Sequence, residues 1–271
     1  MYRGFNLLLK NNFFKQDYFE KFQKIGVKSF SNQKAKIIEK ISSFANGDGS
    51  LDGTKMQENW FPQIEADIFI SHSHKDEKLA LALAGWLKKT FGLTTFIDSC
   101  VWGYANDLLK IIDNKYCLKD MHSYSYEKRN YSTSHVHMML SVALTKMIDN
   151  TECLFFLNTP KSITPDTIIN QTESPWIYSE ITTSQLIRKK RLEEYRHVAL
   201  TESQSTFSEG GKIIPRFRYG LPVDHLTDID NIVLINWVES WQIEAYFCHN
   251  SPQYSESSRV YALDKLYELI K

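Results

Sequence analysis

The segment from Ala66 to Leu87 reads "ADIFISHSHKDEKLALALAGWL" and contains the clearest fold signal in the chain. A short apolar run, Asp67–Ile70, opens onto two serines and two histidines at Ser71–His74. Apolar residues then recur at helical spacing over Glu77–Lys89. We therefore expect a buried strand, a polar loop and an amphipathic helix in direct succession, as at the start of an α/β unit.

The same alternation continues along the rest of the chain. Further strands are expected at Thr94–Ile97, Cys153–Leu157, Arg196–Leu200 and Ile232–Ile235. Further helices are expected at Ala105–Ile112, His135–Ile148, Pro175–Lys190 and Ser257–Lys271. Strands separated by helices predict a parallel sheet covered on both faces, with ligands bound beyond the carboxyl ends of the strands. That edge would gather the segments Ser71–His74, Asp98–Gly103 and Asn158–Ser174.

Residues 1–64 follow a different pattern. One helical stripe ends before Gly26, which is expected to stop the helix, and a second one ends at Asn46. We expect a helical N-terminal extension and linker at 1–64, followed by the α/β domain at 65–271. Residues 114–134 are polar and rich in Tyr and Ser, and they are expected to form a loop inserted into that domain. A second long connection, 201–228, is expected to hold a strand or hairpin at Lys212–Tyr219.

The composition limits the classes of partner. The chain has 271 residues with 32 basic and 32 acidic side chains, and this zero net charge argues against a general nucleic-acid binder. The N-terminus has no apolar signal segment, and no apolar run approaches the roughly 20 residues that span a bilayer. The four cysteines form no C-x-x-C pair. We expect a cytoplasmic protein that binds neither membrane nor nucleic acid.

Metal binding has little support in the sequence. The pairs His72/His74 and His135/His137 could supply ligands, but neither has the Cys or acidic partner of a standard motif. In a helix, moreover, residues two apart do not converge. The segment Asp48–Gly53 is similar to the start of a calcium loop, yet Asn59 stands where the bidentate Glu is needed. No metal site is expected.

The stretch "ESPWIYSEI", residues 173–181, is the most informative candidate site. Ser174 is a good N-cap and Pro175 suits the first helical position. Trp176 and Glu180 are then one turn apart on one helical face. A carboxylate beside an indole at the sheet edge could hold ribose hydroxyls and stabilise positive charge on a sugar ring. On spacing alone, a core Trp and a solvated Glu are the commoner arrangement.

Three motifs, taken in order, resemble Toll/interleukin-1 receptor (TIR) domains. The first strand and helix are similar to the bacterial type, D-[VI]-F-[IL]-S-[HY]-S-x-x-D, which is matched by Asp67, Phe69, Ser71, His72, Ser73 and Asp76. The stretch "TTFIDS", leading into "CVWGYANDLLK", resembles the second strand and the mobile loop after it. The family pattern S-x-W-x-x-x-E is matched by Ser174, Trp176 and Glu180. The resemblance spans residue 66 to about residue 190.

The resemblance implies a flavodoxin-like fold and, for the enzymatic members, cleavage of NAD+ at the nicotinamide–ribose bond. Glu180 would be the catalytic carboxylate and Trp176 would shape the pocket. Further substrate contacts are expected from Ser71, His72, Ser73, Asp98 and Trp102. Among these, Trp102 would belong to a loop that closes over the substrate.

NAD+ would be the substrate, and no bound cofactor is expected. The products would be nicotinamide and either ADP-ribose or a cyclic isomer of it. Bacterial members often act in anti-phage defence, as in Thoeris-like systems, where a nucleotide product activates a separate effector. The resemblance also implies self-association through TIR surfaces.

Two other functions remain open. Some TIR domains only associate, so the chain could be a non-catalytic scaffold or adaptor. A nucleoside deoxyribosyltransferase-like enzyme would also combine a parallel sheet with a glutamate. Retention of Trp176 and Glu180 favours NAD+ cleavage, because a pure adaptor has no chemical need for that carboxylate.

Overall fold

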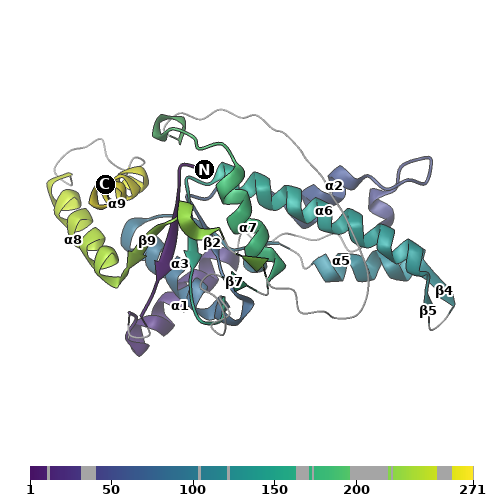
Figure 1. The fold of residues 1–271 in the computed structure, drawn as a ribbon, viewed down its shortest axis with the longest axis horizontal. Helices are drawn as coiled ribbons and strands as arrows, with labels where there is room; N and C mark the ends of the chain where they lie inside the picture. Colours follow the sequence, from purple (N-terminus) through teal and green to yellow (C-terminus); the bar gives the residue numbers. More distant parts are fainter. Residues whose placement is uncertain are drawn as a thin grey trace.

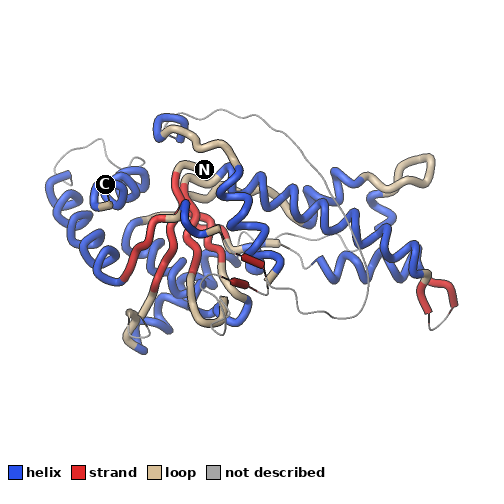
Figure 2. Tube along the Cα trace, viewed as in Figure 1, coloured by secondary structure: helices blue, strands red, loops and turns tan. Residues whose placement is uncertain are grey.

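The computed structural model describes residues 1–10, 13–31, 41–102, 105–120, 123–162, 171–172, 174–195, 219–220, 222–248 and 258–270. Within this part of the chain, a five-stranded sheet lies at the centre with helices around it (Figures 1 and 2). Its strands are β1 (Arg3–Leu8), β2 (Ile68–Ser71), β3 (Thr95–Phe96), β6 (Cys153–Leu157) and β9 (Thr227–Asp230).

Every pairing in this sheet is parallel, and the spatial order is β3-β2-β6-β1-β9. In β2, for example, Phe69 lies opposite Phe96 of β3 and Leu154 of β6. The strands β2 and β6 are buried along their whole length, because helices cover the sheet. The predicted α/β fold with a parallel sheet is confirmed, and so are the strands expected from 67, 94 and 153 onward.

The N-terminal strand β1 corrects one expectation. We expected residues 1–64 to be a helical extension, but Arg3–Leu8 pairs with β6 on one side and β9 on the other. The first strand of the chain therefore takes an interior place in the sheet. The reason it was missed is that a short apolar run does not distinguish a buried strand from a helix.

The helix α1 (Gln16–Ser31) packs along α3 (Glu77–Phe91). Gly26 was expected to end the first helix, but it lies inside α1. A Cβ on Gly26 would lie 2.1 Å from the Leu81 carbonyl oxygen, and one on Gly85 would lie 1.9 Å from that of Phe22. The two glycines therefore permit a close contact between the helix backbones.

The remaining elements are mostly helical. The other helices are α2 (Gly53–Trp60), α4 (Asp98–Val101), α5 (Ala105–Ile112), α6 (Tyr126–Asn150), α7 (Pro175–Leu186), α8 (Asn231–Cys248) and α9 (Ser258–Leu269). Two short antiparallel pairs join β4 (Leu118–Asp120) to β5 (Ser123–Tyr124) and β7 (Gln171–Thr172) to β8 (Tyr219–Gly220). The helices expected at 77–89, 105–112, 175–190 and 257–271 are confirmed, with small shifts at their ends.

The expected loop at 114–134 is the second correction. A π-helical turn at Asp113–Cys117 and the hairpin β4–β5 are followed by α6, which begins at Tyr126. Ser125 caps this helix by accepting a hydrogen bond from the backbone N–H of Lys128. The outer half of α6 runs away from the sheet alongside α5 and α2, forming an arm at one end of the molecule (Figure 1).

The expected strand at Ile232–Ile235 is the third correction, because these residues lie in α8. The strand β9 ends just before them, and the Asp230 carboxylate accepts hydrogen bonds from the backbone N–H groups of Ile232 and Val233. This side chain therefore caps the helix in the manner of an N-cap aspartate. The strand expected at Arg196–Leu200 and residues 212–218 of the expected hairpin lie outside the described residues.

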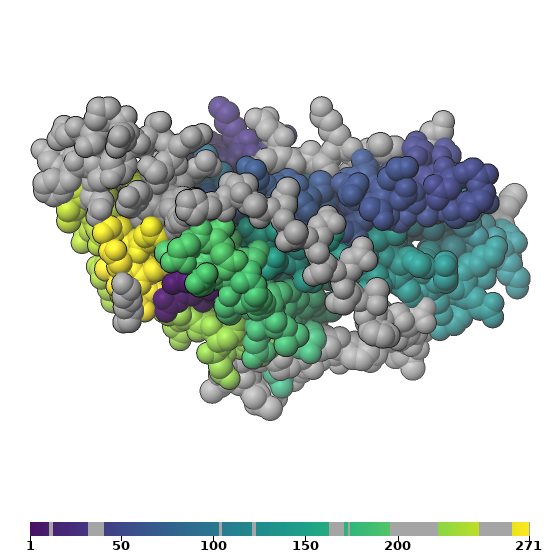
Figure 3. Space-filling model, turned by 90° about the horizontal axis from the view of Figure 1, so that it is seen from above, coloured from purple at the N-terminus to yellow at the C-terminus, as the bar shows by residue number. Residues whose placement is uncertain are grey.

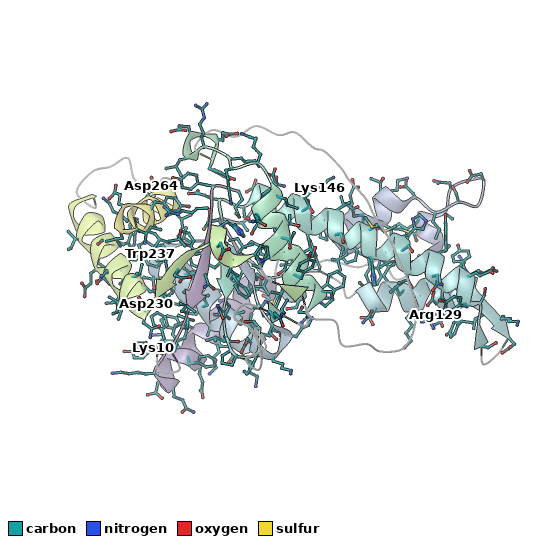
Figure 4. All side chains as sticks on the ribbon, viewed as in Figure 1. Lys10, Arg129, Lys146, Asp230, Trp237 and Asp264 are labelled. Carbon is teal, nitrogen blue, oxygen red and sulfur yellow. The ribbon has the colours of Figure 1, made fainter. Side chains whose placement is uncertain are left out.

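A large aromatic cluster anchors the C-terminal helices to the sheet domain. Trp237 of α8 stacks on Phe91 at 3.9 Å between ring centroids, and its indole N–H donates to the Ala262 carbonyl of α9. Figure 4 places Trp237 on the inner side of α8 and Asp230 at the end of β9, near Lys10.

Within the described part of the chain, no helix is both long enough and apolar enough to cross a membrane.

Candidate functional site

The site begins at the N-terminus of α7. The Ser174 hydroxyl accepts a hydrogen bond from the backbone N–H of Ile177, and Pro175 occupies the first turn. These local signals set the start of the helix and hence the face that Glu180 presents. Because α7 packs against β2, that face meets the carboxyl end of the strand.

Glu180 and Ser71 meet in the interior. Ser71 is the last residue of β2 and is 1% exposed, while Glu180 is 4% exposed. The Ser71 hydroxyl donates a hydrogen bond of 2.6 Å to Oε2 of Glu180. The structure thus brings together two of the residues that the sequence motifs single out, 109 positions apart.

The environment of Glu180 favours its protonated form. Burial raises the pKa of Glu180 well above its ordinary value of 4.5, and the negative charge of nearby Asp98 raises it further. The hydrogen bond from Ser71 opposes both effects by stabilising the carboxylate. Carboxyl groups with a pKa shifted by burial and a neighbouring charge cluster at functional sites.

His72 lies next to this pair in the chain. It is 8% exposed, and burial lowers the pKa of its imidazole, while the charge of Asp98 counteracts this. Its Nε2 atom is buried and finds no hydrogen-bond partner in the described part of the chain. Such an orphan group is rare in folded proteins and calls for a specific explanation, such as a ligand.

Asp98 is half-buried and begins α4, directly after β3 and Ile97. Its charge acts on both Glu180 and His72, which places it electrostatically within the same site. Ser73, by contrast, has a local role, because its hydroxyl accepts a hydrogen bond from the backbone N–H of Lys75 and caps a 3-10 turn. Of the predicted contacts, Ser71 therefore meets Glu180 directly and Asp98 acts on it through its charge, while His72 lies beside Ser71 in the chain and within reach of the same Asp98 charge.

Trp176 is half-buried and faces a neighbour that the sequence motifs do not predict. Its indole meets the His137 ring edge-on, with 5.7 Å between centroids and an interplanar angle of 89°. His137 belongs to α6, and burial lowers the pKa of its imidazole. Trp176 thus couples α7 to α6 one helical turn before Glu180.

The position of Trp102 differs from the expected one. This residue was expected to close over a substrate, but it is 3% exposed and its indole N–H donates to the Pro62 carbonyl at 2.7 Å. Its ring packs between Phe61 and Phe96, at 5.6 and 4.9 Å between centroids. An apolar pocket and a satisfied indole N–H therefore hold the Trp102 ring in the core of this structure, whereas the sequence predicts a contact with substrate.

Two polar clusters near the sheet were missed in the sequence. The Asn6 amide donates to Asp228 at 2.7 Å and accepts from Asn158 at 2.9 Å, so it links β1, β9 and the end of β6. Asp76 is buried and accepts from Thr159 at 2.5 Å and Lys161 at 2.9 Å. The place of Asn158, directly after a buried strand, was an available signal for the first cluster.

His225 is a second histidine that contacts α7, the helix that carries Glu180. Ser184, one turn further along α7, lies 2.8 Å from Nε2 of His225 and also donates to the Ile181 carbonyl. Burial and nearby Lys189 lower the pKa of His225. This pair fixes the face that α7 turns toward the residues preceding β9.

The fold and the site define the class of protein: an α/β protein with an all-parallel central sheet and a buried carboxyl at the carboxyl end of β2. A scan against protein-family models, a search of curated proteins and a search of solved structures found no match to this chain.

Proposed function

We propose that this protein is a TIR-type NAD+ hydrolase or cyclase that breaks the nicotinamide–ribose bond. The proposal rests above all on one observation, the burial of Glu180 against Ser71 at the carboxyl end of β2. The three ordered motifs that resemble TIR domains support it independently. Ligands of parallel α/β sheets bind at this edge, which is consistent with the position of the pair.

The chemistry of the bond suits a single carboxylate. When the bond between C1′ of the ribose and the pyridinium nitrogen breaks, its electron pair passes to the ring and nicotinamide leaves uncharged. The ribose then carries oxocarbenium-like positive charge, as in glycoside hydrolysis. Glu180 would stabilise this charge and orient the ribose hydroxyls. Water attack on C1′, with loss of a proton, gives ADP-ribose, whereas attack by an internal nucleophile gives a cyclic isomer.

The raised pKa of Glu180 fits a substrate that is itself cationic. Without substrate, burial and Asp98 favour the neutral carboxyl. A pyridinium ring beside it would favour the ionised form, because an opposite charge lowers the pKa of a carboxyl. Substrate binding would therefore release a proton and prepare the carboxylate that the reaction needs.

Other residues near the site would make separate contacts with the substrate. The buried Nε2 of His72 offers an unused hydrogen-bonding group to the nucleotide. Trp176 would border the nicotinamide-ribose pocket, held in place by His137. Since Glu180 is closed off from solvent, substrate entry requires a local opening, and self-association through TIR surfaces would be one way to stabilise it.

In a bacterial cell this activity would serve anti-phage defence of the Thoeris-like kind, with the nucleotide product sensed by a separate effector. NAD+ is the substrate in this scheme and no resident cofactor is required. The binding partners would be NAD+ and further copies of the chain, in a cytoplasmic setting.

The test is to incubate purified full-length protein with NAD+ and to follow nicotinamide release. The proposal predicts release by the native chain, loss with Glu180→Gln and full activity with Glu193→Gln, a change of an exposed carboxyl outside the site. No release over a wide range of protein concentration would favour a scaffold. Exchange of bases on deoxynucleosides would instead favour a deoxyribosyltransferase. Mass analysis of the product distinguishes linear from cyclic ADP-ribose.

A further inference from the structure

The arm formed by α2, α5 and the outer half of α6 borders a separate cavity that is open to solvent on one side. Its volume is about 690 Å³, within the range of small-molecule sites. The walls come from the loop before α2, from the π-helical turn after α5 and from one face of α6. Figure 3 shows the blue segment that contains α2 lying along teal α6 at this end of the molecule.

The lining is aromatic and sulfur-rich. Tyr116, Tyr131 and His135 contribute rings, and Met56 and Met139 contribute thioethers. Tyr131 and His135 are already arranged edge to face, at 4.4 Å between centroids. Aromatic rings and thioethers pack well against a flat ring system. These walls therefore favour a planar aromatic ligand over a flexible aliphatic one.

The charges at the rim balance. Glu127 and Lys128, adjacent on α6, are both exposed and both line the cavity. One acid and one base at the rim favour a ligand without net charge that carries hydrogen-bonding groups at its edges. Neither a phosphate cradle nor a cationic patch is formed by the described lining.

A polar network centred on the buried side chain of Asp113 links the elements of the inner wall. Asp113 accepts a hydrogen bond of 2.7 Å from Ser132 and forms an ion pair of 2.8 Å with Arg129. These two contacts connect the π-helical turn to α6. Figure 4 shows Arg129 near the outer end of α6, with Lys146 much closer to the sheet. π-helical turns are uncommon and often mark functional sites, because they realign side chains within a helix.

We propose that this cavity is a second small-molecule site, specific for an uncharged planar aromatic ligand with polar edges. It is separate from the Glu180 site, since its described lining includes no residue of α7 or β2. The two sites share α6: His135 lines the cavity and His137 meets Trp176 of α7. A ligand in the arm would thereby act on α7. This regulatory part rests on the proposed function, whereas the binding site does not.

The experiment uses the full chain and Prodan, a neutral, planar, polarity-sensitive naphthalene dye. We expect saturable binding of one dye per chain with a blue shift of its emission. Tyr131→Ala removes an aromatic wall from an exposed position and should weaken binding at least about fivefold. Met139→Trp, which fills the cavity, should weaken it further. Tyr126→Ala removes an exposed tyrosine of the same helix that is not among the described lining residues and should change the affinity less than about twofold.

The results test the binding site and its coupling to α7 separately. Unsaturable binding, or equal binding by the native chain, Tyr131→Ala and Met139→Trp, overturns the site. Binding retained by Glu180→Gln supports its independence from the catalytic carboxyl, whereas loss of binding there overturns that independence. If the dye binds and nicotinamide release responds to it in the native chain but not in Tyr131→Ala, the coupling through α6 is supported. If release is measurable and indifferent to the dye, the coupling is wrong and the site stands.

Discussion

Glu180 of α7 accepts a 2.6 Å hydrogen bond from Ser71 at the end of β2, although 109 positions separate the two residues. Both side chains are buried, so the bond forms where water cannot compete for either group. The pair therefore joins the stability of the fold to the protonation of the candidate catalytic carboxyl.

The first prediction concerns stability and pH. The pKa of Glu180 is raised in the folded chain, so the folded state binds this proton more tightly than the unfolded state does. Its contribution to the free energy of unfolding then falls as pH rises from 4.5 through the folded pKa, and it is constant at lower pH. Glu180→Gln removes this dependence. We expect urea unfolding at about pH 4 and pH 8 to show that the free energy of unfolding of the variant, relative to that of the native chain, is higher at pH 8 than at pH 4. A constant difference between the two would contradict the shift, and exposed Glu193→Gln is the control.

The second prediction concerns activity and pH. The hydrogen bond from Ser71 lowers the pKa of Glu180, so Ser71→Ala raises it further. The acidic limb of the kcat/KM profile for nicotinamide release should therefore move to higher pH. Ser73→Ala is the matched control, because that hydroxyl caps a turn. An unmoved limb in Ser71→Ala would mean that the ionisation of Glu180 does not limit the reaction.

The third prediction concerns the contact between α1 and α3. A Cβ at Gly85 would lie 1.9 Å from a backbone carbonyl oxygen, so Gly85→Ala must push the helices apart. We expect a loss of about 1–3 kcal/mol in the free energy of unfolding, as in other overpacked cores. Gly47→Ala is the control, because nothing lies within 4 Å of the added methyl group. Chemical denaturation of both variants checks this, and equal stabilities would refute the close contact.

The fourth prediction concerns Trp102. Trp102→Phe keeps an aromatic ring between Phe61 and Phe96 but leaves the Pro62 carbonyl without the indole donor. The expected cost is about 1 kcal/mol of stability, with the activity of the folded fraction unchanged. Thermal unfolding and nicotinamide release, measured on the same sample, test both statements. A variant that keeps native stability but has lost its activity would show instead that Trp102 acts at the substrate site.

Local patterns made much of the fold predictable. Short continuous apolar runs predicted β2 and β6, and apolar residues at helical spacing predicted α3. The capping signals at Ser174 and Pro175 placed the start of α7. The same reasoning failed at β1 and at the start of α8, where a short apolar run fits a strand and a helix equally well. At α8 the capping carboxylate of Asp230 was the signal that could have distinguished a helix from a strand.

The sequence by itself predicted α3, α5, α7, α9 and three of the strands, because periodicity and capping act between near neighbours. Its resemblance to TIR motifs singled out the candidate carboxyl Glu180. Only the tertiary structure decided that β1 enters the sheet, that Trp102 is a core residue and that Ser71 holds Glu180. It also decided the direction of the Glu180 pKa, since that depends on which distant groups exclude water from the carboxyl and bring Asp98 near it. Burial and Coulomb interactions arise from packing between segments far apart in the chain, and no local pattern encodes them.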